Sequence, residues 1–244
     1  LMSKLIIYAP NVWAGGGLIL LKSLIQSWPD DLSFYAFLDF RIYGLLDLPR
    51  NSKIHWVKPT IWSRISAELT LFKVSTHKDV IIHKNSLPPL FKSKGKTVLF
   101  MQNVTIIRSG PLSGYTLSQA LRLRIERLVC YIFRRTVDEY IVQTKSVKTS
   151  VEHWYKCRNE IDKPNITVFP FMENIEETKN SCEDEDFNFD FIYVSDGMAH
   201  KNHATLFFAW KELADQGIFP SLAVTVHPSD SNLASQVEIL KKEG

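Results

Sequence analysis

The chain has 244 residues, of which 45% are hydrophobic and 23% are charged, so it is long enough for one large or two modest domains with real cores. Its 29 basic and 26 acidic residues leave a formal net charge of +3, and this small balance argues against a nucleic-acid partner held by bulk electrostatics. The three cysteines, Cys130, Cys157 and Cys182, form neither a CxxC pair nor a zinc-ligand pattern, which favours a reducing cytoplasm. The opening LMSKLIIYAP is typical of a buried strand and not of a signal peptide, and no apolar run approaches the roughly 20 residues of a bilayer span.

The first predicted element is a strand over Lys4–Ala9, a continuous apolar run that ends at Pro10-Asn11. The segment NVWAGGG follows, and then LILLKSLIQSW has helical periodicity. A strand, a glycine-rich turn and a helix in succession form the opening unit of a doubly wound α/β domain. Turn signals and helical stretches separate the next predicted strands, which are Leu32–Leu38, Ile54–Val57, Asp79–His83 and Thr97–Met101.

The segment Leu117–Trp154 predicts a helix, a short strand at Tyr140–Val142 and a second helix. Ile166–Phe169, followed by Pro170, is expected to be the last strand of this domain. Five arginines lie along the first helix, whose apolar positions recur at helical spacing. They are Arg122, Arg124, Arg127, Arg134 and Arg135, with apolar Leu121, Ile125, Leu128, Val129 and Ile132. Two interpretations stay open: a core-packed helix with a solvated basic face, or attraction to anionic lipid.

The composition turns acidic and polar over residues 173–188, which is typical of an interdomain linker. A new βα unit then begins with a predicted strand at Asp190–Val194, a helix at Ala204–Gln216 and a strand at Leu222–Val226. The predicted organisation is therefore a first Rossmann-like domain over residues 1–172, the linker, and the start of a second domain over 189–244. Two strands cannot bury an independent core, so the second domain is expected to be incomplete.

Three stretches resemble glycosyltransferase family four, particularly its bacterial surface-polysaccharide members. They are NVWAGGGLILLKSLI near the start, IVQTKSVKTSV at Ile141–Val151 and FIYVSDGMAHKNHATLFFAWKEL at Phe191–Leu213. The resemblance follows the order of the family over nearly the whole chain. It implies the GT-B fold, in which two facing Rossmann-like domains hold the substrates, the first (here residues 1–172) mainly the acceptor and the second (here residues 189–244) mainly the nucleotide-sugar.

The family's activity implies that a sugar passes from a nucleotide-diphosphate donor, with retention of configuration, to a growing surface polysaccharide of the O-antigen, capsule or lipopolysaccharide type. The acceptor is then an oligosaccharide or is linked to a lipid, and the expected location is the cytoplasm or the inner face of the membrane. The nucleotide-sugar is a substrate, and neither a cofactor nor a metal is expected. The acidic triplet Asp184-Glu185-Asp186 lies in the predicted linker and does not follow a buried strand, so it is not interpreted as a metal site.

The departing diphosphate needs cations, backbone amides or helix amino termini around it. Gly15, Gly16 and Gly17 suit this role because backbone N–H groups can approach phosphate closely where a helix begins, although the same residues could form only a tight turn. By resemblance, Lys201 matches the diphosphate-binding lysine of the family and His200 stands beside it. Asn202 and His203 are expected to cap and position the next helix.

Two departures from the family pattern weaken the donor site. Asp196 stands in Ser195-Asp196-Gly197, where many relatives have a basic residue. The paired-glutamate segment that holds the donor sugar in the family would lie beyond Gly244, so this chain is expected to bind a nucleotide-sugar weakly or not at all.

In the first domain, His83 and Asn85 follow one predicted strand, and Gln102 and Asn103 follow another. These positions match places where relatives carry polar active-site groups, so the four residues are catalytic candidates. His83 could instead be a buried histidine at the strand end, and the two asparagines could be turn residues.

Two rival interpretations come from other classes of protein. A catalytically incompetent fragment or pseudo-enzyme would keep the first domain and an acceptor or partner surface. A dinucleotide-binding enzyme on the same fold would need a GxGxxG fingerprint and an acidic residue closing the second strand, and the sequence has neither at its first strand.

Overall fold

The computed structural model describes residues 3–108, 110, 112, 115–158, 164–170, 189–195, 197, 201–226 and 231–243. The chain divides into two compact units, the first formed by Leu1–Leu112 and Thr116–Glu173 and the second by Ser113–Tyr115 and Asn174–Gly244. The predicted linker over residues 173–188 lies outside the described residues, so its position stays a prediction.

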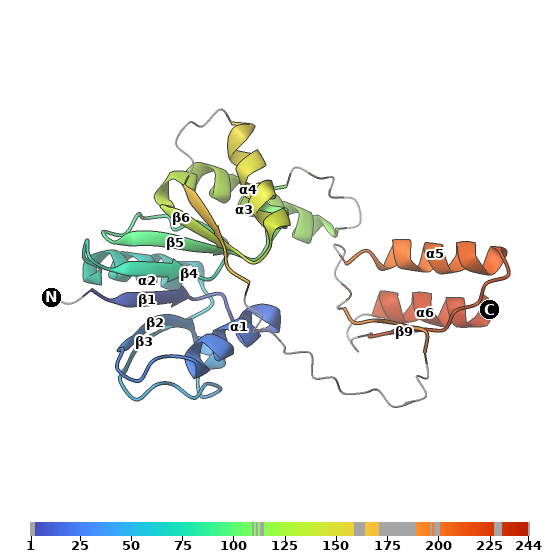
Figure 1. The fold of residues 1–244 in the computed structure, drawn as a ribbon, viewed down its shortest axis with the longest axis horizontal. Coiled ribbons are helices and arrows are strands. Elements are labelled where there is room, and N and C mark those ends of the chain that lie inside the picture. Colours follow the sequence, from blue (N-terminus) through green and yellow to red (C-terminus); the bar gives the residue numbers. More distant parts are fainter. Residues whose placement is uncertain are drawn as a thin grey trace. The chain divides into compact units, whose positions relative to one another are not determined.

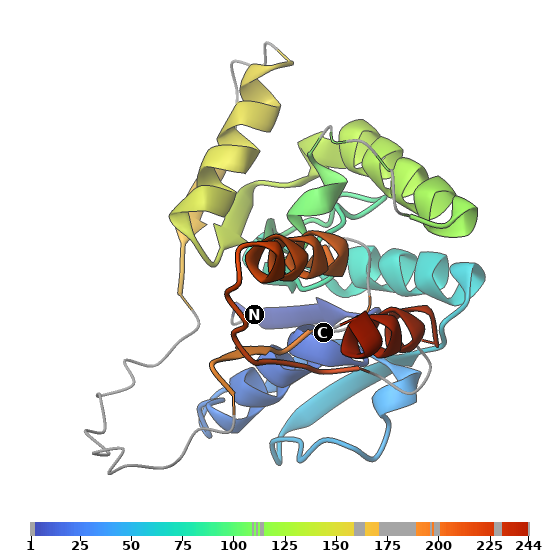
Figure 2. The same ribbon diagram turned by 90° about the vertical axis from the view of Figure 1, so that its right-hand side faces the viewer.

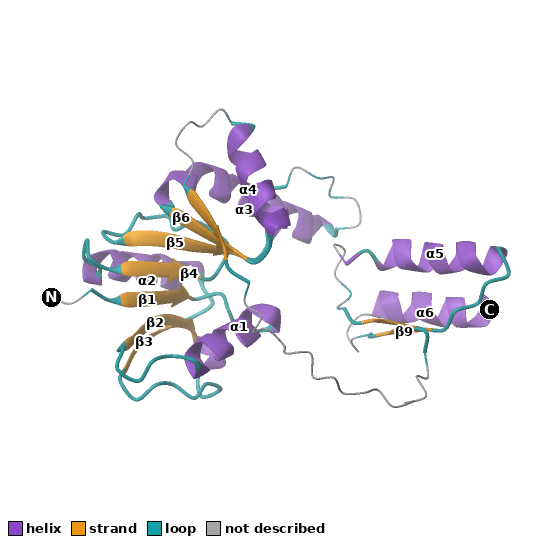
Figure 3. Cartoon of the chain, in the orientation of Figure 1, coloured by secondary structure: helices purple, strands orange, loops and turns teal. Residues whose placement is uncertain are grey.

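Within its described residues, the first unit is built on a seven-stranded sheet in the order β3-β2-β1-β4-β5-β6-β7 (Figures 1 and 3). Every pair of neighbouring strands is parallel. This is the order of a doubly wound Rossmann-type sheet with one further strand at the end. The predicted α/β fold class is therefore confirmed. The strands are β1 (Leu5–Ala9), β2 (Phe34–Asp39), β3 (Ser52–Val57), β4 (Val80–His83), β5 (Lys96–Met101), β6 (Glu139–Val142) and β7 (Asn165–Val168).

Four α-helices connect these strands, namely α1 (Gly15–Gln26), α2 (Ile61–Val74), α3 (Leu117–Phe133) and α4 (Lys145–Lys156). The sequence analysis did not identify α2 as a separate element. A threonine stands just before three of these helices, Thr60 before α2, Thr116 before α3 and Thr144 before α4. Each threonine hydroxyl accepts a hydrogen bond from a backbone N–H group in the first turn of its helix. Such caps satisfy backbone N–H groups that have no partner inside a helix, so they fix where each helix begins.

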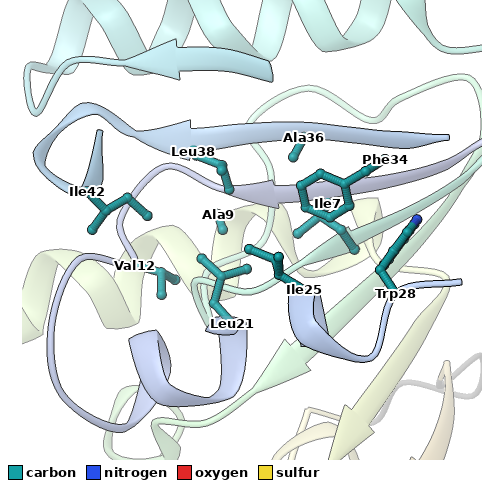
Figure 4. Packing of buried hydrophobic residues seen from close by; sticks show 10 residues of the cluster. All are labelled: Ile7, Ala9, Val12, Leu21, Ile25, Trp28, Phe34, Ala36, Leu38 and Ile42. Carbon is teal, nitrogen blue, oxygen red and sulfur yellow. The ribbon is translucent and has the colours of Figure 1, made fainter. Parts of the chain in front are cut away.

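The core lies on both faces of the sheet because alternate residues of each strand point to opposite sides. Ile7 and Ala9 of β1 pack in one cluster with Leu21 and Ile25 of α1 (Figure 4). The other face of β1, with Ile6 and Tyr8, packs in a second cluster with Ala67 and Leu71 of α2. Helices α1 and α2 thus cover opposite sides of β1, as Figure 2 shows. A strand covered on both faces must be apolar throughout, which explains the run KLIIYA.

Four of the apolar positions predicted on α3 are exposed and do not pack in the core. Leu121, Ile125, Leu128 and Ile132 expose between 53% and 59% of their surface, whereas Leu123 and Cys130 are the residues that the helix buries. The buried face and the predicted apolar face are therefore different faces of the helix. The core-packed interpretation therefore does not hold at these four positions, because periodicity identifies an apolar face without showing what that face contacts.

The second unit contains β8 (Phe191–Tyr193), α5 (His203–Asp215), β9 (Leu222–Val224) and α6 (Ser231–Glu243). Strands β8 and β9 are parallel and form a two-stranded sheet within the described residues. Its apolar side chains stay largely in contact with solvent, and Ile192 of β8 is 70% exposed. Asn202 precedes α5 as predicted, but it adopts a left-handed conformation with φ of 56°, and its side chain makes no capping hydrogen bond within the described part of the chain.

Candidate functional site

A cavity of about 530 Å³ opens at the carboxyl edge of the first sheet. Strands β1 and β4 are neighbours there, and the chain order reverses between them. Doubly wound proteins bind their ligands at this switch point, because the loops after the two strands diverge and leave a crevice. The residues around the cavity come from the loops after β1, β2, β4 and β5 and from α1, α2 and α3. They are Asn11, Val12, Trp13, Ala14, Gly17, Arg41, Arg64, Lys84, Asn85, Ser86, Leu87, Gln102, Asn103, Ile106, Arg122 and Glu126.

Ser86, in the loop after β4, is hydrogen-bonded to the segment that follows β5. Its hydroxyl accepts hydrogen bonds from the backbone N–H groups of Gln102 (2.9 Å) and Asn103 (3.1 Å). Ser86 has a φ of 60°, a left-handed conformation that costs a non-glycine residue free energy. The two hydrogen bonds hold this conformation, and they place the amide side chains of two loops around one space.

Arg41 and Arg122, two of the cations around the cavity, form ion pairs with carboxylates. Arg41 donates to the fully buried Asp39 through two nitrogens, at 2.8 and 2.6 Å. Burial by itself raises the pKa of Asp39, but the hydrogen bonds from Arg41 outweigh it and leave that pKa below its usual value. Arg122 forms an ion pair of 2.8 Å with Glu126, one turn further along α3. These pairs fix the two arginines at the wall of the cavity.

The other two cations are Arg64 of α2 and Lys84 at the end of β4. Lys84 is 2% exposed, and its backbone N–H donates to the carbonyl of Tyr8, which continues the ladder of β1 and β4. Burial lowers the pKa of Lys84 to about 8 and also lowers the pKa of Arg64. The Nε of Arg64 is buried and has no hydrogen-bond partner within the described residues.

Three neutral side chains around the cavity also hold polar atoms without partners in the described part of the chain. They are Asn11 Oδ1, Asn85 Oδ1 and Gln102 Nε2, all of them shielded from solvent. Buried polar atoms are normally hydrogen-bonded, and each unsatisfied one costs about 1–3 kcal/mol. Their convergence on one cavity indicates a site completed by a polar ligand.

The four catalytic candidates divide at this cavity. Asn85, Gln102 and Asn103 lie around it. The Oδ1 of Asn103 accepts hydrogen bonds from the N–H and the hydroxyl of Thr105. Asn103 therefore caps a short 3-10 helix over Val104–Ile106. His83 does not border the cavity; it is fully buried with its ring centroid 4.8 Å from that of Tyr8. Burial lowers the pKa of His83 to about 3, so the ring is neutral. No ring nitrogen of His83 has a hydrogen-bond partner among the described residues.

The three glycines of residues 15–17 differ in their surroundings. Gly17 borders the cavity, and a Cβ added there would lie 3.3 Å from Gln102 Oε1 and 3.5 Å from Val12 Cγ1. Gly15 and Gly16 face open space, and Gly15 has a φ of +62°, which a residue with a side chain would adopt only with strain. The three glycines form the first turn of α1. The backbone N–H groups of this turn therefore lie at the edge of the sheet where the cavity opens.

The donor-side candidates belong to the second unit. The carbonyl of Lys201 accepts a hydrogen bond of 2.7 Å from the Tyr193 hydroxyl, which fixes the backbone just before α5. A separate cavity of about 650 Å³ in this unit is mainly apolar and lies among α5, β9 and α6, and Lys201 does not border it. His200 and Asp196 lie outside the described residues, as does the acidic triplet at 184–186. Donor-phosphate binding by His200 and Lys201 stays a prediction.

Arg41, Arg64 and Lys84 border the cavity but were not among the residues predicted from the sequence. A signal for Lys84 exists, because a lysine that directly follows a buried strand at a sheet edge is a ligand candidate. Arg64 could be found only by recognising α2. Arg41 stacks on Trp13, with 4.2 Å from the guanidinium carbon to the ring centroid, a contact between two distant loops.

The chain is a Rossmann-type α/β protein with a polar cavity, bordered by cations, at the switch point of its first sheet. No protein-family model matches the sequence, and a search of curated proteins finds no relative. Among solved structures, Phytolacca americana UGT2 complexed with UDP-2-fluoro-glucose and pterostilbene aligns over 92% of this chain and 72% of that chain, with a TM-score of 0.45 and 10% identity. A likeness of this size bears on neither the reaction nor the substrates of this chain.

Proposed function

We propose that this protein is a GT-B glycosyltransferase that transfers a sugar from a nucleotide-diphosphate donor with retention of configuration. The observation that carries the proposal is the polar cavity at the switch point, bordered by Gly17 and by the amides of Asn85 and Gln102. The three sequence stretches that resemble glycosyltransferase family four supply the reaction class. Neither a cofactor nor a bound metal is part of the proposal.

The chemistry of the cavity suits a sugar nucleotide. The leaving diphosphate gains negative charge in the transition state, and N–H groups at a helix amino terminus stabilise such charge. The first turn of α1 offers these groups at Gly15–Gly17. Amide side chains such as those of Asn11, Asn85 and Gln102 both donate and accept, so they suit the hydroxyl groups of a sugar. Lys201 and His200 of the second unit stay proposed as donor-phosphate ligands, on the resemblance to the family.

The acceptor that we propose is a growing surface polysaccharide of the O-antigen, capsule or lipopolysaccharide type, either lipid-linked or free as an oligosaccharide. Helix α3 supports a position at the inner face of a membrane. Its exposed stripe of Leu121, Ile125, Leu128 and Ile132 is apolar, and the exposed Arg124 stands on the same helix. A helix with exposed apolar and basic residues binds the surface of an anionic bilayer. No helix in the described part of the chain has the length and hydropathy that a bilayer span requires.

The proposal is tested by calorimetric titration of the purified chain with UDP, GDP and their common sugar conjugates. We expect saturable binding of one nucleotide and tighter binding of one of its sugar conjugates. Binding of an oligosaccharide acceptor without binding of any nucleotide would instead indicate the incompetent-fragment alternative. Absence of binding to every nucleotide and conjugate would contradict the proposed function.

A further inference from the structure

The two inner cations of the cavity have no role in the function proposed so far. Arg41 and Arg122 have carboxylate partners within 4 Å, Asp39 and Glu126, whereas no such partner stands beside Arg64 among the described residues. Arg64 and Lys84 reach the same cavity from α2 and from the end of β4. The cavity therefore has more positive than negative side chains around it.

This arrangement costs stability in the absence of a ligand. A cation loses hydration where it is buried, fully as in Lys84 or in part as in Arg64, and the lowered pKa of Lys84, about 8, and of Arg64 reflects that loss. The Nε–H of Arg64 is a buried donor without an acceptor in the described residues. Both costs would be offset by one dianionic group in the cavity, because a phosphate offers several acceptor oxygens and negative charge to a guanidinium fork.

We propose that Arg64 and Lys84 form a phosphate-binding site in the first unit, which holds a phosphate or diphosphate ester of the substrate. The unpartnered amide atoms of Asn11, Asn85 and Gln102 lie around the same cavity and suit the hydroxyl groups attached to that phosphate. The site deepens the proposed function and in that sense rests on it. The phosphate belongs either to the nucleotide-sugar donor or to a phosphorylated acceptor.

The test titrates the full chain with inorganic pyrophosphate, UDP and glucose 1-phosphate at constant ionic strength. Two variants remove one charge each with little change of size, Arg64→Gln and Lys84→Met. Matched controls remove the same charges from exposed positions outside the cavity, Arg50→Gln and Lys73→Met. We expect the parent and both controls to bind pyrophosphate, and each cavity variant to bind it about ten- to a hundredfold more weakly, as expected for a lost charge-assisted hydrogen bond.

The two organic probes identify the source of the phosphate. A loss confined to UDP assigns the site to the donor, and a loss confined to glucose 1-phosphate assigns it to the acceptor. A site that binds pyrophosphate through Arg64 in a chain that binds no nucleotide-sugar would keep this inference and overturn the proposed glycosyl transfer. Equal pyrophosphate affinity of parent and cavity variants, or none in the parent, would overturn the phosphate site itself.

A measurement on the parent alone covers the case in which a variant does not fold. Pyrophosphate should slow amide hydrogen exchange in the cavity segments 84–87 and 102–106, because a ligand that binds the native state suppresses local opening. Unchanged exchange in both segments at a saturating concentration would contradict the site independently of any substitution.

Discussion

Glu68 of α2 shows how a single residue makes stability depend on pH. Its carboxylate accepts hydrogen bonds from the N–H groups of Leu90 (2.7 Å) and Phe91 (3.2 Å). Burial outweighs these bonds and raises the pKa of Glu68 to about 7. Between the unfolded value of 4.5 and about 7, the folded chain holds a proton that the unfolded chain has released, so Glu68 reduces stability as pH rises through this window.

We therefore expect Glu68→Gln to be more stable than the parent above pH 7, by up to about 3 kcal/mol, and to lose this advantage near pH 4.5. The measurement is the free energy of unfolding in urea at several pH values for both proteins. Tyr8, the titratable neighbour of Glu68, has its pKa raised by burial and stays neutral throughout. His83 titrates in the opposite sense, but its contribution cancels in the difference between the two proteins. A difference independent of pH would contradict the raised pKa.

A substitution at His83 distinguishes its two interpretations, a catalytic residue or a buried histidine at the end of a strand. The ring packs on Tyr8 and does not border the switch-point cavity, and its nitrogens have no partner in the described residues. We expect His83→Phe to leave nucleotide and pyrophosphate affinity within about twofold of the parent, with an unchanged or higher melting temperature, because it removes buried polar atoms that form no hydrogen bond. Loss of ligand binding with a melting temperature like that of the parent would restore the catalytic interpretation.

At the scale of elements, the exposed apolar stripe of α3 predicts that the protein binds to membrane surfaces. Replacing two residues of its exposed stripe, Leu121→Gln with Ile125→Gln, removes apolar surface without disturbing the buried Leu123 and Cys130. We expect the parent to sediment with vesicles of phosphatidylglycerol and phosphatidylcholine, and the variant to bind them at least tenfold more weakly.

The control for α3 removes the same kind of surface from α2, with Leu69→Gln and Phe72→Gln, both 42% exposed. This variant should bind vesicles like the parent, and binding of the parent should weaken with salt and with the omission of phosphatidylglycerol. Equal binding of the α3 and α2 variants would contradict a membrane role for α3.

The sequence predicted elements whose signal is local and missed those defined by contacts. The strands at 4–9, 79–83 and 97–101 were predicted within a residue or so because a strand covered on both faces is continuously apolar. Helix α2 was missed because its pattern is mixed, with Arg64 and Glu68 on the inward-facing side. The exposed stripe of α3 could not be distinguished from a core face, since both have the same period.

The candidate site was predicted in part for the same reason. The topology places the residues after β4 and β5 at one edge, and Asn85, Gln102 and Gly17 do meet at the cavity. The burial of His83, the capping role of Asn103 and the approach of Arg64 from α2 depend on side-chain packing. Packing of this kind has no signal in a single sequence.

At the scale of the molecule, the two units differ in how much apolar surface they bury. Strands β1 and β2 of the first unit pack into clusters on both faces, whereas Phe191 and Ile192 of β8 are mostly exposed. We expect the amides of β8 and β9 to exchange hydrogen at least tenfold faster than those of β1 and β4, because local stability follows buried apolar contact. Hydrogen exchange followed by mass spectrometry provides the measurement. Similar protection in both units would show that the second unit is stabilised by contacts that its own residues do not provide.

The cavity at the switch point is proposed to contact the nucleotide-sugar through the glycines of α1, and Gly17 allows the most direct test. A valine there directs its side chain at Gln102 Oε1 and Val12 Cγ1, so Gly17→Val fills part of the cavity. The matched control, Ser23→Val, places the same side chain on the exposed face of the same helix. Calorimetry with the nucleotide-sugar that binds the parent most tightly should show at least tenfold weaker binding for Gly17→Val and an affinity within about twofold of the parent for Ser23→Val. Equal affinities of the two variants, both folded, would contradict the claim.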